Sequence, residues 1–128
     1  MSDADHPQAW IEKAESDFLC IENNLAAKRI PWEVVAFHAQ QAAEKMLKAF
    51  LVSREQNVTK THDLTFLLNQ CRGLAPEFED LGEECRWLTR YAVHFRYPGE
   101  EMAVEEAEAR SAIDAARKVE KAIRSMLP

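Results

Sequence analysis

The sequence predicts an all-α protein, an antiparallel up-and-down bundle of four main helices plus one short helix. Apolar residues recur at three- and four-residue steps through most of the chain, and no stretch shows the two-residue alternation of a strand. Glycines and prolines fall between these periodic stretches, where they can end helices and turn the chain. They are Gly73, Gly82, Gly99, Pro31, Pro76 and Pro98. Because the expected connections are short, successive helices should lie antiparallel.

Length and charge limit the functions that the chain can have. At 128 residues it suits one helical domain, residues 1–128, and its 47% apolar and 30% charged residues are typical of a soluble globular protein. The net charge of −6 opposes non-specific binding to nucleic acid or to anionic membranes, because a basic field supplies most of that affinity. No apolar run reaches the length of a membrane span, so we expect no membrane partner.

The cysteines and the first residues indicate a reducing compartment. Cys20, Cys71 and Cys85 are odd in number and lack the spacing of a zinc site. The N-terminal residues lack the basic and apolar regions of a signal peptide. We therefore expect a cytoplasmic protein with reduced thiols, no metal and no cofactor.

The first helix is predicted from about Pro7 to Lys28, with a buried stripe at three- and four-residue steps. The stripe comprises Trp10, Ala14, Phe18, Ile21 and Leu25. Pro31 then suits the first turn of a second helix, where a backbone N–H is not needed. This second helix should continue to about Arg54.

The second helix has two faces that differ in chemistry. At about 100° per residue, its small and apolar residues gather on one narrow side, which lets a neighbouring helix approach closely. They are Val35, Ala39, Ala42, Ala43, Met46, Ala49 and Phe50. The polar side comprises His38, Gln41, Glu44, Lys45 and Lys48. We expect these polar residues to face outward, with Lys45 and Lys48 each in an ordinary solvated pair with Gln41 or Glu44. Phe37, which lies among them, is expected to contact a second molecule.

A short third helix should follow a loop over residues 55–60. Asp63 can N-cap this helix, which should end near Gly73. His62, next to this cap, is most simply interpreted as ordering the loop that enters the helix. A fourth helix is then predicted from about Phe78 to His94. It should end there because Pro98 disfavours a helical conformation at the residue before it, Tyr97.

The last helix should begin near Glu100, where the acidic residues Glu100 and Glu101 suit the positive end of the helix dipole. Its apolar stripe is long and continuous, which predicts that one face packs along the bundle. The stripe comprises Ala109, Ala112, Ile113, Ala116, Val119, Ile123 and Met126.

Cations and aromatic residues alternate where the fourth helix should end. Arg86, Arg90 and His94 recur at four-residue steps and would share a face, and Arg96 follows them. The aromatic residues between them are Trp87, Tyr91, Phe95 and Tyr97. This arrangement suits a phosphate with a stacked base. In the alternative interpretation, the aromatic residues pack under the last helix and the arginines pair with its glutamates.

Four sequence blocks together resemble one known family. They are Trp10, Ala14 and Asp17; residues 37–49, which contain Phe-His-Ala-Gln-Gln-Ala-Ala-Glu-Lys and then Leu-Lys-Ala; Thr61-His62-Asp63-Leu64; and Arg96-Tyr97-Pro98. In this order and over nearly the whole chain, they resemble the HEPN (higher eukaryotes and prokaryotes nucleotide-binding) domain family. The resemblance implies a small helical bundle, commonly a homodimer, and often a partner of a minimal nucleotidyltransferase in a toxin–antitoxin-like pair.

The resemblance also implies a chemistry from which this chain departs. Many HEPN proteins are metal-independent ribonucleases with an Arg, four to six intervening residues and then a His. In that chemistry the His moves protons and the Arg stabilises charge on the phosphate. Here only three residues separate Arg90 from His94, and no His follows Arg96. The chain therefore resembles the branch in which this motif is missing or degenerate.

Three functions follow as hypotheses. The first is a non-catalytic homodimeric module that docks a minimal nucleotidyltransferase through Phe37, His38, Gln41 and Lys45, and that binds nucleotide, phosphate or RNA near Arg90, Arg96 and Tyr97. The second is a ribonuclease toxin that uses Arg90 and His94 at an atypical spacing. The third is a purely structural dimer within a larger assembly.

Overall fold

The computed structural model describes residues 3–92 and 103–128, and every regular element in these ranges is helical. Three helices are long: α1 (Pro7–Leu25), α2 (Trp32–Ser53) and α5 (Glu106–Met126). Two are shorter, α3 (Leu64–Leu74) and α4 (Gly82–Thr89), and two are 3₁₀ turns, η1 (Asp3–Asp5) and η2 (Pro76–Leu81). The all-α class is confirmed. The described residues hold three long and two shorter helices, where four main helices and one short helix were predicted.

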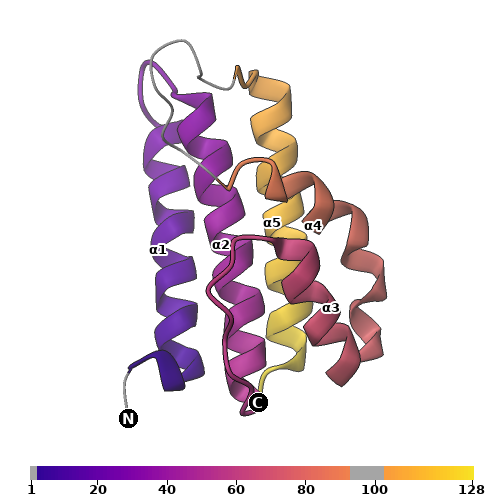
Figure 1. Cartoon of the computed structure of the whole chain (residues 1–128). Helices are drawn as coiled ribbons and strands as arrows, with labels where there is room; N and C mark the ends of the chain where they lie inside the picture. Colours follow the sequence, from indigo (N-terminus) through magenta and orange to yellow (C-terminus); the bar gives the residue numbers. More distant parts are fainter. Residues whose placement is uncertain (1–2, 93–102) are drawn as a thin grey trace.

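Helix α2 is the central element of the bundle. It lies between α1 and α5, and α3 and α4 pack on the side of the bundle away from α1 (Figure 1). Helices α1 and α2 are antiparallel, as predicted for neighbours joined by a short connection. The connection through residues 54–63 runs back along α2 before α3 begins (Figure 1), so α3 starts beside the middle of α2.

Alanines form the centre of the core. The predicted inward residues of α2, including Ala39 and Ala43, are fully buried, and Ala14 of α1 and Ala112 of α5 are fully buried opposite them. Small side chains let the three long helices approach closely, so their packing depends on having no larger group at these positions. Among the described residues, no helix is long and apolar enough to cross a membrane.

The predicted helix boundaries are partly confirmed. Helix α1 begins at Pro7 as predicted but ends at Leu25, short of Lys28. Pro31 is the N-cap of α2 and has extended backbone angles, so it lies just outside the first turn rather than within it. Asp63 caps α3 as predicted, because its Oδ1 accepts from the backbone N–H of Thr65 at 3.0 Å.

The boundaries of the last two helices were predicted less well. The chain over Pro76–Leu81 is 3₁₀, and α4 ends at Thr89, whose hydroxyl donates to the Cys85 carbonyl at 2.8 Å and accepts from the Leu64 N–H at 3.1 Å. These bonds hold the end of α4 against the start of α3. Helix α5 begins at Glu106, because its N-cap Glu105 has extended backbone angles. The predicted start at Glu100 is not confirmed, and Glu100 itself lies outside the described residues.

Candidate functional site

The polar side of α2 forms a buried cluster around Glu44. One carboxylate oxygen of Glu44, Oε1, lies 2.8 Å from Nδ1 of His62 and accepts from Nε2 of Gln40 at 3.2 Å. The other oxygen, Oε2, accepts from Nζ of Lys48 at 2.8 Å. The side chains of Glu44 and Lys48 are only 4% and 7% exposed. We call Gln40, Glu44, Lys48 and His62 the Glu44 cluster.

Lys48 pairs with Glu44 as predicted, but the pair is buried rather than solvated. The predicted pairing of Lys45 with Gln41 or Glu44 is wrong, because Lys45 binds Asp17 of α1 instead. Trp10 of α1 covers Lys48, with the lysine Nζ 5.6 Å from the centre of the indole ring. The connection before α3 covers Glu44, because the Gln40 side chain also donates to the His62 carbonyl at 3.0 Å and fixes that segment. A carboxylate taken out of water requires several donors, and the Glu44 cluster supplies them.

A second cluster surrounds Asp17 on α1. Its Oδ1 lies 2.8 Å from Nδ1 of His38, and its Oδ2 accepts from Nζ of Lys45 at 2.6 Å. These bonds tie α1 to the polar side of α2. The Gln41 side chain donates to Gln40 at 2.6 Å, which joins this Asp17 cluster to the Glu44 cluster.

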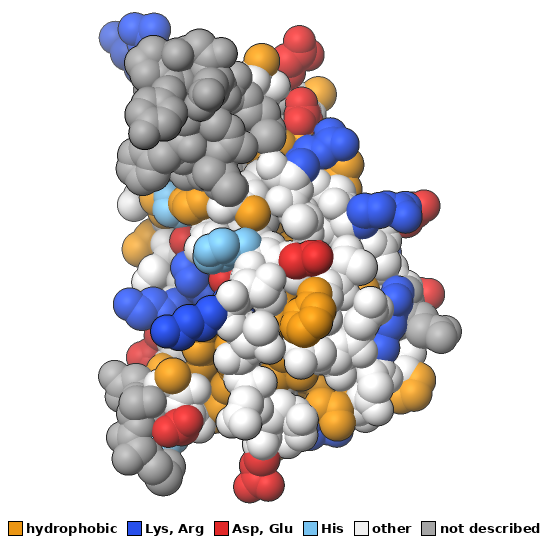
Figure 2. All heavy atoms as spheres, viewed as in Figure 1, with side chains coloured by type: hydrophobic (Ala, Val, Ile, Leu, Met, Phe, Trp, Pro, Cys, Tyr) orange, Lys and Arg blue, Asp and Glu red, His pale blue; other side chains and the backbone are white. Residues whose placement is uncertain are grey.

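Each cluster buries its carboxylate and places a histidine partner nearer the surface, while Gln40 and Lys48 of the Glu44 cluster are buried with it. The Asp17 side chain is 9% exposed, whereas its partners His38 and Lys45 are 23% and 21% exposed, and His62 is 61% exposed. On the face shown in Figure 2, His side chains lie near Lys and Arg side chains over the α1–α2 side. Ionised carboxylates only accept hydrogen bonds, so Nδ1 of each histidine donates and Nε2 points away from the carboxylate.

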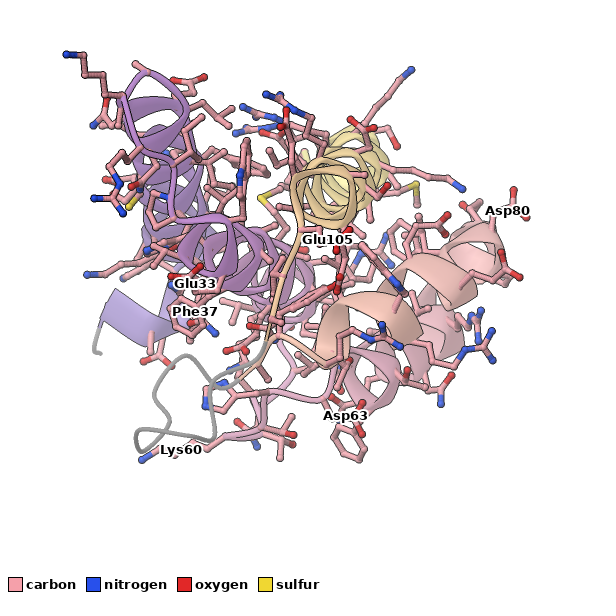
Figure 3. All side chains as sticks on the ribbon, turned by 90° about the horizontal axis from the view of Figure 1, so that it is seen from above. Glu33, Phe37, Lys60, Asp63, Asp80 and Glu105 are labelled. Carbon is pink, nitrogen blue, oxygen red and sulfur yellow. The ribbon has the colours of Figure 1, made fainter. Side chains whose placement is uncertain are left out.

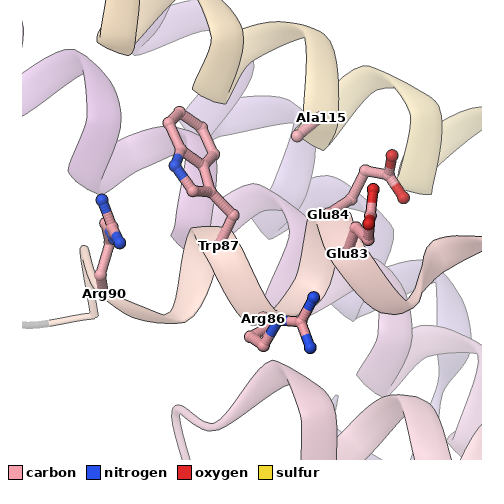
Figure 4. Close-up of a pocket in the computed structure, with 6 residues that line it drawn as sticks. All are labelled: Glu83, Glu84, Arg86, Trp87, Arg90 and Ala115. Atoms are coloured by element: carbon pink, nitrogen blue, oxygen red, sulfur yellow. The ribbon is translucent and has the colours of Figure 1, made fainter.

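A cleft of about 470 Å³ lies between α4 and α5 (Figure 4). It is lined by Glu83, Glu84, Arg86, Trp87, Arg90 and Ala115. The Arg90 guanidinium lies 6.0 Å from the centre of the Trp87 ring, a cation–π arrangement, and Arg90 is exposed. Of the predicted phosphate-binding residues, Arg90 therefore lies at the surface beside an indole ring. Arg96, Tyr97 and the predicted His94 lie outside the described residues.

Tyr91 follows α4 and packs inward. It is 2% exposed, its ring contacts the Trp87 ring edge-on, and its hydroxyl donates to the Glu108 carboxylate. Burial, and then the hydrogen bond and charge of Glu108, raise the pKa of Tyr91 well above its usual value of 10.0. The hydroxyl is thus held protonated inside the domain, and this aromatic residue does pack under α5.

Comparison with known families decides which family the chain represents. The HEPN domain family matches residues 7–126, nearly the whole chain. The chain belongs to the HEPN domain family. Comparisons with curated proteins and with solved structures give no match. The described part of this HEPN domain holds no group of three His, Cys, Asp or Glu side chains arranged to bind a metal ion.

The four predicted interface residues of the HEPN domain are all half-buried, at the polar side of α2. His38 and Lys45 bind Asp17, Gln41 binds Gln40, and the rings of Phe37 and His38 meet edge-on with centres 5.3 Å apart. Figure 3 shows Phe37 one turn after Glu33 on α2. Phe37 is not part of the core, and its role in an interface stays a prediction.

Reasoning from sequence missed the part that Asp17 and Gln40 have in these clusters. A signal for Asp17 was present, because it lies three residues after Ala14 and four before Ile21, within the inward stripe of the first helix. An acidic residue at such a position requires a buried partner. The link from Glu44 to His62 gives no such signal, since it joins a helix to a loop 18 residues away.

Proposed function

We propose that this HEPN domain is a binding module that self-associates as a homodimer and docks a minimal nucleotidyltransferase, in a toxin–antitoxin-like pair. The proposal rests on family membership and on the departure of the Arg90/His94 spacing from the ribonuclease motif.

The main observation in favour of a docking surface on α2 is the ring contact between Phe37 and His38. The rings meet at 75°, and Asp17 fixes the histidine through Nδ1. A rigid, half-exposed aromatic pair loses little side-chain entropy on binding, and such anchors dominate the energetics of protein interfaces. We therefore place Phe37 at the centre of the docking surface, with His38, Gln41 and Lys45 around it.

Self-association and docking are tested with one variant and a matched control. Phe37→Ala is expected to lower the affinity for the second copy, or for a minimal nucleotidyltransferase partner, by about tenfold or more. Phe66→Ala removes another part-exposed phenyl ring, on α3, and is expected to leave both affinities unchanged. Light scattering measures the mass and co-purification measures docking. A monomer at micromolar concentration would exclude the homodimer.

The second part of the proposal is phosphate or nucleotide binding at the cleft between α4 and α5. Arg90 and Arg86 supply charge there and Trp87 supplies a ring for stacking, which matches the needs of a nucleotide. Binding should weaken steeply as salt rises, because few cation–phosphate contacts carry it. Arg90→Met should remove most of the affinity, measured by calorimetry at low and high salt.

The ribonuclease alternative is supported by the exposed position of Arg90 at the end of α4. It requires that the protein cleave single-stranded RNA in EDTA, and that His94→Ala abolish the cleavage. Equal cleavage by both proteins, or none by the wild type, rejects this function.

A further inference from the structure

A second cleft, of about 510 Å³, lies at the end of the bundle where α1 begins and α2 ends (Figure 1). Three segments line it, namely η1 with the start of α1, the end of α2, and the connection that follows α2. The volume falls within the usual range of small-molecule sites. The lining residues that define its chemistry are Trp10, Lys48, Val52, Glu55, Val58 and Lys60.

Three of these residues continue one side of α2. Lys48, Val52 and Glu55 follow one another at four- and three-residue steps, so they share a side of the helix and of the turn that ends it. At a rise of about 1.5 Å per residue, the backbones of Lys48 and Glu55 lie about 10 Å apart along the helix axis. The cleft therefore has a cation towards one end, a carboxylate at the other and an apolar side chain between them.

Lys48 is a buried donor in the wall of the cleft. Its side chain is 7% exposed, and its Nζ donates to Oε2 of Glu44 at 2.8 Å. An ammonium group has three N–H donors, so Lys48 can bind a ligand acceptor while it keeps Glu44. The chain reverses after α2 and runs back along it (Figure 1), which carries the exposed Lys60 back towards Lys48 and adds a second cation.

Glu55 supplies the carboxylate at the opposite end. It has a left-handed φ of 61°, and the N–H of Gln56 donates back to the Leu51 carbonyl at 3.0 Å, a pattern that ends helices. Within residues 3–92 and 103–128, Glu55 is the one non-glycine residue with a positive φ. Glycine takes this conformation with less strain, and strained residues cluster at binding sites. Asp5 of η1 adds a second acidic side chain to the lining.

The wall between the charged groups suits an apolar side chain flanked by amides. The indole N–H of Trp10 donates to a backbone carbonyl of η1 at 3.0 Å, which holds the ring in place. Val52 and Val58 are half-buried and add apolar surface. Gln56 and Asn57 are exposed, and their side-chain amides carry both donors and acceptors, as peptide groups require.

We propose that this cleft binds a short extended peptide, of about three residues, with a free amino terminus and a free carboxyl terminus. An extended chain spans about 3.3–3.6 Å per residue, so three residues match the separation of Lys48 and Glu55. The terminal carboxylate binds Lys48 and Lys60, and the terminal ammonium binds Glu55. The central side chain packs on Trp10 and Val52. A single amino acid is too short to reach both ends, and an organic anion or cation leaves one end without a partner.

The three tryptophans report separately on binding. Trp10 lies in this cleft, Trp87 lines the cleft between α4 and α5, and Trp32 packs against Arg110. The indole signals in ¹H–¹⁵N spectra are assigned from single Trp→Phe variants. Titration of the tripeptides alanyl-leucyl-alanine and alanyl-phenylalanyl-alanine should shift the Trp10 signal to saturation and leave the other two unchanged.

Blocking either terminus of the peptide tests the two charged contacts. The N-acetylated and the C-amidated forms of each tripeptide should bind about fivefold to tenfold more weakly than the free form, because each loses one charge-assisted contact. Equal affinities of the free and blocked forms would overturn the proposal, and so would the lack of a saturable Trp10 shift with both tripeptides.

Variants of the two exposed charged residues assign each contact. Glu55→Gln should weaken binding of the free tripeptide by about fivefold, and acetylation should then bring almost no further loss. Lys60→Met should in the same way reduce the loss caused by amidation. Lys48 is left unchanged because it also binds Glu44.

Matched controls are Glu33→Gln at the start of α2 and Lys121→Met on α5, both exposed, which should leave all affinities unchanged. If acetylation costs as much in Glu55→Gln as in the wild type, the ammonium contact is wrong, and the corresponding result for Lys60→Met rejects the carboxylate contact. A shift of Trp87 alone would overturn this cleft as the peptide site. The inference does not rest on the proposed function, since neither the α2 docking surface nor the cleft between α4 and α5 enters it.

Discussion

The Glu44 carboxylate is buried, and hydrogen-bond donors from two segments of the chain bind it. Lys48 and Gln40 come from its own helix, and His62 comes from the connection before α3. An intact buried ion pair adds little net stability, because the attraction between the charges is offset by the cost of removing them from water. Removing one partner is strongly destabilising, because the other charge then stays buried without a partner. Glu44 is thus the common hydrogen-bond partner that holds Lys48 and His62 in place.

Glu44→Ala should therefore lower the free energy of unfolding by about 3–5 kcal/mol. The variant leaves the Lys48 ammonium buried and removes the acceptor for Gln40 and His62. Urea unfolding followed by circular dichroism measures the loss. Glu106→Ala is the matched control, since Glu106 and Arg110 form an i,i+4 pair of the same spacing that is more than half exposed. It should cost no more than about 0.5 kcal/mol, and equal losses in the two variants would contradict the buried-pair argument.

At the scale of elements, the surroundings of α2 decide which of its faces are buried. Its alanine stripe was predictable, because helical periodicity places Ala39, Ala42 and Ala43 on one side. The opposite side was predicted to be solvated, yet Glu44 and Lys48 are buried there. Periodicity within one helix gives the relative orientation of its side chains but not the number of neighbours that cover it. A central helix is covered on several sides, and only the packing of α1 and of the connection reveals it.

The N-terminus of α3 was predicted from a single residue, and that residue can be tested. Asp63 accepts from the N–H groups of Thr65 and Phe66 at 3.0 and 3.3 Å, which satisfies donors that the helix cannot pair itself. Asp63→Ala should destabilise the domain by about 1 kcal/mol, whereas Asp63→Asn should be nearly neutral because asparagine caps as well. Thermal unfolding measures both, and a loss of equal size for the two variants would assign the effect to charge instead.

A substitution at the C-terminus of α2 is expected to stabilise the domain rather than destabilise it. Glu55 holds a left-handed φ of 61°, which costs a residue with a Cβ about 1–2 kcal/mol and costs glycine little. Glu55→Gly should therefore raise the free energy of unfolding by about 0.5–1 kcal/mol after the greater entropy of the unfolded glycine chain is subtracted. Glu55→Ala removes the same charge but keeps the strain. It should bring no gain in denaturant unfolding, and an equal gain would assign the effect to the carboxylate.

For the whole molecule, long-range contacts are what sequence reasoning could not supply. The helical class and the HEPN family followed from periodicity and from short blocks of residues. The bonds that join the polar side of α2 to α1 and to the connection before α3 instead link residues 18 to 28 positions apart, such as Asp17 with Lys45. No local pattern encodes them. Since α2 contacts α1, α3, α4 and α5, we expect the domain to unfold as one cooperative unit.

Cooperative unfolding makes the buried thiols a determinant of stability at high pH. Cys71 and Cys85 are fully buried, and burial is the main cause that raises the pKa of each thiol from 9.0 to about 12. Between these values the unfolded chain has released the thiol protons while the folded protein retains them. The unfolded state then binds fewer protons, so the free energy of unfolding falls as pH rises.

The expected slope approaches about 1.4 kcal/mol per pH unit for each thiol above pH 9, with no contribution from either thiol below it. Tyr91, whose pKa is also raised by burial, adds to the loss only above its ordinary value of 10.0. Urea unfolding at pH 8, 9 and 10 with reductant measures the slope. Cys85→Ala is less stable at pH 8 because it leaves a cavity, yet it should lose only about half as much stability between pH 9 and 10. Parallel curves for the two proteins would mean that a group other than the Cys85 thiol sets the alkaline limit.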